Sequence, residues 1–163
     1  MSITPIFEAM NHLDKLHKSL LGLSFKKTEL IKTGDMEGLD QLLKDEQKHV
    51  AAISQLETQR QQKVMEYLQA KGFANAEPTV ASVIEAAGTE EKEQLEHVRD
   101  ELMRTIHDLK WQNDLNQKMT YQSLQFVNLS LDMLRPTPES INYSKDTIKR
   151  AKSAGNSTFD SQA

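Results

Sequence analysis

Few residues of this chain have types and spacing suited to chemistry. Glu46 and His49 stand three positions apart, the carboxylate–imidazole spacing that four-helix di-iron proteins use for metal ligands. Such a site needs a second pair of this kind and further inward-facing carboxylates, and Glu93 and His97 are four apart, a different geometry. We therefore expect no metal site and interpret the pair as a polar helix position beside a solvent-facing histidine. A di-iron or other metal enzyme is kept as an alternative hypothesis.

The sequence also shows no motif typical of other kinds of active site. Serine, histidine and aspartate all occur, but no stretch resembles a nucleophile elbow, and the six glycines stand singly or at expected helix ends. The sequence contains no glycine-rich loop of the kind that binds phosphate. We expect a protein without enzymatic activity, catalytic residues or cofactors.

The charge and composition of the chain indicate which kinds of partner and which cellular compartment to expect. The net charge of −4 divides into −6 for residues 1–134 and +2 for residues 135–163, so the main body is acidic and poorly suited to nucleic acid. There is no cysteine, no apolar run long enough to span a membrane and no signal-peptide pattern at the first residues. These features predict a cytoplasmic protein without a membrane span.

The apolar pattern predicts an all-α protein. Apolar residues repeat every seven positions in the first helix, starting from Ile6 and from Leu16, and Gly34-Asp35 marks its end. The second helix has an apolar seam that polar residues interrupt at Glu46, His49 and Arg60. We expect an elongated antiparallel bundle or coiled coil of three long helices and one short helix in residues 1–134, followed by a flexible tail, 135–163. The expected helices span about 3–33, 36–70, 79–87 and 89–134.

The last helix carries more apolar surface than a small bundle needs. A helix in such a bundle requires one apolar face, whereas this one has two stripes at helical spacing. The first, expected to face the bundle, contains Leu95, Leu102, Ile106, Leu109, Leu124, Val127, Leu131 and Leu134; the second contains Leu115, Met119, Phe126, Leu129 and Met133.

Polar residues interrupt the first stripe where the second begins. Asn113 and Asn116 continue the spacing of Ile106 and Leu109, and Thr120 and Ser123 follow. One interpretation is that the amides fix the register of the helices inside the bundle. The other is that they orient a partner helix in a groove, with the apolar residues as anchors, and the coincidence of the polar gap with the start of the second stripe favours this second interpretation.

The second stripe has two interpretations as well. It could pack against the first helix or a second copy of the chain, which would make the protein a structural coiled coil that homodimerises through its last helix. Alternatively, it could accept an amphipathic helix from a partner, for which its two methionines are adaptable contacts.

Taken in order, several helical segments resemble one known family over nearly the whole chain, to about residue 145. The chain is similar to the FlgN-type flagellar export chaperones. The matching segments are Leu30-Ile31-Lys32-Thr33-Gly34-Asp35, then Leu39, Leu42, Glu46 and Ile53-x-x-Leu56-Glu57-x-x-Arg60, then Asn113-x-x-Asn116 and the run from Tyr121 to Leu134, and finally Tyr143.

The resemblance implies a cytosolic helical chaperone, transiently at the flagellar export apparatus, that is a monomer or weak homodimer. Its partners would be the C-terminal helices of hook–filament junction proteins, and the export gate to which it delivers them. Tyr143 matches a tail tyrosine implied to contact the gate. The implied cargo-binding residues are Asn116, Met119, Gln122, Ser123, Phe126, Val127, Leu129 and Met133.

Overall fold

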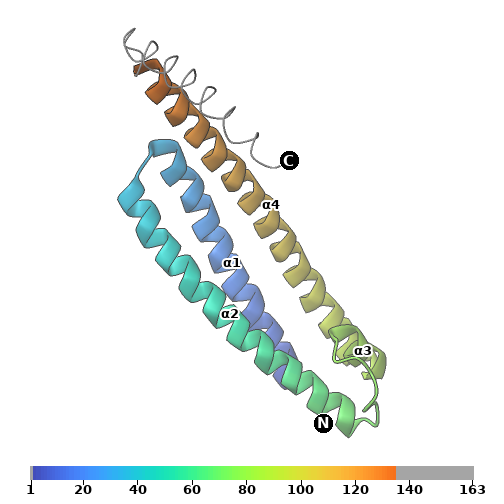
Figure 1. Cartoon of the computed structure of the whole chain (residues 1–163). Coiled ribbons are helices and arrows are strands. Elements are labelled where there is room, and N and C mark those ends of the chain that lie inside the picture. Colours follow the sequence, from blue (N-terminus) through green and yellow to red (C-terminus); the bar gives the residue numbers. More distant parts are fainter. Residues whose placement is uncertain (1, 135–163) are drawn as a thin grey trace, which may run out of the picture. The chain divides into compact units, whose positions relative to one another are not determined.

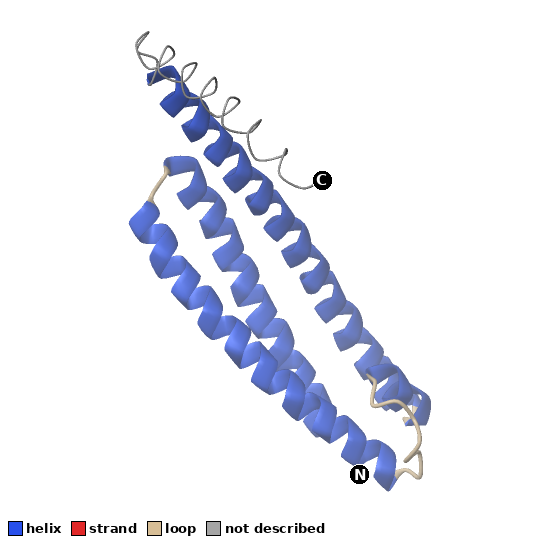
Figure 2. Ribbon diagram, viewed as in Figure 1, coloured by secondary structure: helices blue, strands red, loops and turns tan. Residues whose placement is uncertain are grey.

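The computed structural model describes residues 2–134, which form four helices and no strand (Figure 2). The helices are α1 (Thr4–Thr33), α2 (Met36–Ala70), α3 (Val80–Ala86) and α4 (Thr89–Leu134), so the predicted all-α fold with three long helices and one short helix is confirmed. The chain divides into two compact units after Thr120, within α4, whereas the sequence places a boundary at 134. The expected tail, 135–163, with Tyr143, lies outside the described residues.

The connection between α1 and α2 follows from the local sequence. Gly34 adopts a left-handed conformation with φ of 69°, which favours glycine because it has no Cβ, and its N–H donates to the carbonyl of Ile31. The next residue, Asp35, caps α2 because its carboxylate accepts the backbone N–H of Gly38 at 2.9 Å. Two adjacent residues therefore end one helix and start the next.

Helices α1 and α2 lie side by side in antiparallel directions (Figure 1), and polar residues pair across them. The ammonium of Lys27 lies 3.0 Å from a carboxylate oxygen of Glu46. The Nε2 atom of His49 lies 2.8 Å from the hydroxyl of Ser19. The Glu46–His49 pair thus takes part in helix pairing, and among residues 2–134 no group of three or more acidic or histidine side chains is placed to hold a metal ion.

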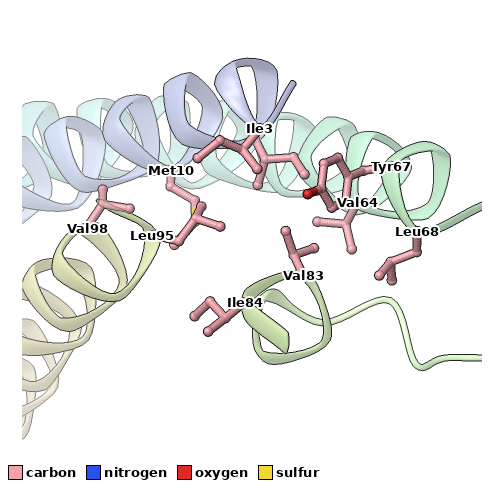
Figure 3. Close-up of a cluster of buried hydrophobic side chains, with 10 residues drawn as sticks. Ile3, Met10, Val64, Tyr67, Leu68, Val83, Ile84, Leu95 and Val98 are labelled. Carbon is pink, nitrogen blue, oxygen red and sulfur yellow. The ribbon is translucent and has the colours of Figure 1, made fainter. Parts of the chain in front are cut away.

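The apolar core of the first unit brings all four helices together (Figure 3). The shortest helix, α3, contributes Val83 and Ile84, and it starts at Thr79, whose hydroxyl accepts the N–H of Ser82 at 3.1 Å. The other members come from α2 and from the beginnings of α1 and α4. The buried members are Ile3, Ile6, Met10, Val64, Tyr67, Leu68, Val83, Ile84, Leu95 and Val98.

The buried seam of α4 differs in part from the predicted one. Leu95 and Leu109 are buried as expected, but Ile106 is 42% exposed and its neighbour Thr105 is buried instead. Likewise Gln112, and not Asn113, is buried. Neighbouring residues on a helix point in directions about 100° apart, so the facing helix decides which of the two is buried. Here α1 presents polar groups, which Thr105 and Gln112 can match by hydrogen bonds.

We predict that truncating Leu95 destabilises the fold strongly. Leu95 is completely buried, so Leu95→Ala removes apolar contacts and leaves a cavity, and the free energy of unfolding should fall by about 2–5 kcal/mol. Urea denaturation followed by circular dichroism measures this. The matched control is Leu124→Ala on the same helix, where the side chain is 58% exposed and the loss should stay below about 0.5 kcal/mol. Equal losses in the two variants would contradict the assignment of the core.

Candidate binding surface

The last part of α4, residues 121–134, exposes all of its large apolar side chains. Their exposed fractions run from 49% for Leu131 to 84% for Leu134. The same stretch contains a single charged residue, Asp132. An uncharged stretch with this much exposed apolar surface is typical of a protein–protein interaction site. The exposed residues are Tyr121, Leu124, Phe126, Val127, Leu129, Leu131, Met133 and Leu134.

These side chains cover more than half of the helix circumference. At about 100° per residue, the two predicted stripes join into one apolar arc of about 220°, from Leu129 round to Leu124. The remaining side carries the polar residues Gln125, Asn128 and Asp132 together with Tyr121. Residues from both stripes are exposed, so neither stripe of this segment is a buried bundle face.

Most of the predicted site residues belong to this exposed segment. Phe126 and Met133 are the most exposed of them, at 70% and 71%. Met119, in the first unit, is half-buried, and both Met119 and Ser123 take part in further noncovalent interactions. Gln122, Ser123, Phe126, Val127, Leu129 and Met133 are all exposed.

Asn116 has a different position from the other predicted residues, because it is buried in the first unit. Only 3% of Asn116 is exposed, and both polar atoms of its side-chain amide form hydrogen bonds. Nδ2 donates to the carbonyl of Ser24 at 2.8 Å, and Oδ1 accepts from the hydroxyl of Thr28 at 2.6 Å. Asn113 is exposed, yet its Oδ1 accepts from the Ser24 hydroxyl at 2.9 Å. This geometry favours the interpretation that the asparagines fix helix register.

The hydrogen bonds between α1 and α4 also define the relative direction of the two helices within the first unit. Thr105 bonds to Asp14 and Asn116 to Thr28, so α1 and α4 run parallel.

One exposed residue was missed by the sequence analysis. Trp111, the only tryptophan, is 64% exposed on the part of α4 in the first unit. It stands four positions before Leu115, the first residue of the second stripe, so helical spacing alone could have identified it. Tryptophan is over-represented at the energetic centres of interfaces.

Comparison with known proteins agrees with the resemblance found in the sequence. The profile of the FlgN protein family matches residues 1–149. The chain belongs to the FlgN family. The protein YvyG of Bacillus subtilis (strain 168), described as uncharacterized, is 36% identical over 164 residues, and the match covers 100% of both chains. No solved structure matches the chain.

FlgN-family membership makes this chain a flagellar export chaperone, of a family that binds hook-associated proteins and is not enzymatic. No helix among residues 2–134 is long and apolar enough to cross a membrane. The chemistry of the surface agrees with such a role, since residues 121–134 offer apolar contact area and few groups that could react.

We predict that Asp14 makes stability depend on pH at the acid end. Burial alone would raise the pKa of its carboxyl, but hydrogen bonds from Lys18 and Thr105 outweigh this and hold the pKa below the ordinary value of 3.8. A lowered folded-state pKa means that charged Asp14 stabilises the fold above pH 3.8, and that this stabilisation is lost as the pH falls through the folded-state value.

Asp14→Asn should therefore lower the free energy of unfolding at neutral pH, and the difference from wild type should shrink between about pH 5 and about pH 2. Urea titrations across this range measure the difference. Asp40→Asn, which removes an exposed partner of Lys44, is the control and should have little effect at any pH. A difference for Asp14→Asn that stays constant with pH would contradict the assignment.

Proposed function

We propose that this chain is a cytoplasmic chaperone that binds the C-terminal helices of hook–filament junction proteins on residues 122–134 of α4. The observation that carries the proposal is the nearly uncharged apolar arc of this segment, exposed over more than half of the helix. Membership of the FlgN family supports the class of cargo. Asn116 is assigned to the bundle and not to the cargo contact.

The proposed mechanism needs no chemistry and no nucleotide. A terminal helix that is apolar on one face self-associates unless that face is covered, and the arc between Leu129 and Leu124 offers a matching apolar surface. The flexible side chain of Met133, which lies between Leu129 and Phe126 in this arc, adapts to side chains of different shape. Covering the cargo helix thus prevents premature assembly.

The expected affinity is moderate, because the cargo must also be released. Full burial of one large apolar side chain contributes about 1.5–3 kcal/mol, and several do so here, while ordering of both partners offsets part of this gain. We expect a dissociation constant between about 1 nM and about 1 μM, or roughly −12 to −8 kcal/mol.

Delivery to the export gate is assigned to a separate part of the chain. The resemblance gives Tyr143 as the gate contact, and this residue lies outside the described residues. We propose that the apolar arc and Tyr143 act independently, one holding cargo and the other contacting the gate.

We predict that the double variant Phe126→Asp with Leu129→Asp loses cargo binding. Both side chains are more than half exposed, so the charges should disrupt the contact with cargo without disturbing the core. Isothermal titration with the C-terminal segment of a hook–filament junction protein measures the loss, expected to be about 100-fold or more. Circular dichroism and thermal melting check the fold.

The matched control is Gln125→Asp with Asn128→Asp, which adds the same charges to the same segment outside the apolar arc and should leave binding nearly unchanged. Unfolding of the Phe126/Leu129 variant would show that the stripe is core and would contradict the proposal. Light scattering on the free protein tests the homodimer alternative: a dimer that the Phe126/Leu129 variant breaks, together with unchanged cargo binding, would favour self-association as the function.

We predict that Tyr143→Ala keeps cargo affinity but impairs delivery. The titration above should give the same dissociation constant as wild type, while secretion of the junction proteins into the medium should fall. Phe159→Ala in the same part of the sequence is the control for a nonspecific effect. Secretion at the wild-type level in Tyr143→Ala would remove the gate contact from the proposal and leave cargo binding untouched.

A further inference from the structure

All buried polar side chains among residues 2–134 lie at the contact between α1 and α4. Three belong to each helix, none is more than 8% exposed, and all are within the first unit. The other buried side chains are apolar, apart from the hydroxyl group of Tyr67, which lies in the apolar cluster with no hydrogen-bond partner among the described residues. We name this set the polar ladder: Asp14, Ser24 and Thr28 of α1, and Thr105, Gln112 and Asn116 of α4.

Hydrogen bonds between the two helices join the members of the ladder. The Thr105 hydroxyl donates to the Asp14 carboxylate at 2.8 Å, and Gln112 Nε2 donates to the Thr28 hydroxyl at 2.6 Å. Asn116 then bonds to Thr28 through Oδ1 and to the Ser24 carbonyl through Nδ2. Each member therefore has a partner, as buried polar groups require.

The same two helices are held differently nearer their N-termini. There Ile3, which precedes α1, and Ile6 and Met10 of α1 share one apolar cluster with Leu95 and Val98 of α4, together with residues of α2 and α3 (Figure 3). α4 thus has an apolar anchor at its beginning and a polar contact from Thr105 to Asn116.

The two kinds of contact respond differently to separation. When apolar side chains become exposed to water, no new interaction offsets the free energy lost with their burial. Hydroxyl and amide groups, in contrast, replace each hydrogen bond within the protein by a hydrogen bond to water. Separation along the ladder therefore costs less than separation along the anchor. The bonds still define one register, because amide and hydroxyl partners must meet in the right pairs.

We propose that the ladder is an opening device: α4 separates from α1 between Thr105 and Asn116 while the anchor at Leu95 and Val98 stays closed. Leu109, which is buried and lies on the same side of α4 as Thr105 and Gln112, becomes accessible on opening. On the proposed function, this offers further apolar surface of α4 to a cargo helix. The opening itself does not depend on that function.

The absence of cysteine permits a sensitive test by thiol labelling of the full chain. Ser24→Cys places a thiol of similar size at a ladder position that is 0% exposed, and Ala9→Cys places one in the apolar part of α1 at 1% exposed. The ladder thiol should react with a water-soluble disulfide reagent at least about tenfold faster under native conditions. Its rate should change little at low urea concentrations, whereas the Ala9→Cys rate should follow global unfolding.

A locked ladder provides the complementary measurement. Gln112→Met with Asn116→Leu replaces the α4 amides by apolar groups of similar size, and the Thr28 hydroxyl keeps a bond to the Ser24 carbonyl at 3.2 Å. This background should slow labelling of Ser24→Cys about tenfold. Gln117→Met, at an exposed position of the same helix, is the control and should leave the rate unchanged.

The possible results distinguish the opening itself from its link to cargo binding. Equal labelling rates for Ser24→Cys and Ala9→Cys, with the same dependence on urea, would overturn the opening device. If Ser24→Cys alters the circular dichroism spectrum, Thr105→Cys on the facing helix replaces it with the same expectations. Cargo titration with the locked chain tests the link to function: weaker binding supports it, and unchanged affinity with slowed labelling removes the link while the opening and the proposed function both stand.

Discussion

The register between α1 and α4 is the constraint on which the rest of this structure depends. Asn116 and Thr105 can satisfy their buried groups only against Thr28 and Asp14, so α4 cannot slide along α1 without leaving polar atoms unpaired. Within the first unit, this register decides which residues of α4 are buried, with Thr105 in place of Ile106.

The fold and the proposed binding surface use different apolar residues of one helix. Leu95 and Val98 hold α4 to the other three helices and are at most 2% exposed. Phe126, Leu129 and Met133 contribute nothing to that core, because each is more than half exposed. A chaperone gains from this separation, since its binding surface can change with its cargo while the residues that maintain the fold remain the same.

Polar residues specify how the helices pair at both the α1–α2 contact and the α1–α4 contact. Lys27 with Glu46 and Ser19 with His49 join α1 to α2, and the polar ladder joins α1 to α4. Such contacts contribute less stability than apolar ones, but each specifies a partner atom. With few aromatic residues in the chain, specificity of pairing comes from these bonds and most of the stability from a single apolar cluster.

The sequence by itself determined the helices and their ends, because local signals specify them: the seven-residue apolar repeat, Gly34 with its left-handed backbone, and Asp35 as a cap. It also identified the apolar surplus of the last helix, which depends only on spacing. It could not decide between neighbours such as Thr105 and Ile106, or whether Asn116 was buried, because adjacent positions on a helix differ by a modest rotation and the facing helix selects between them. That selection, and with it the assignment of Asn116 to the bundle and of Phe126 to the surface, required the tertiary structure, since burial is a property of two surfaces in contact and not of one.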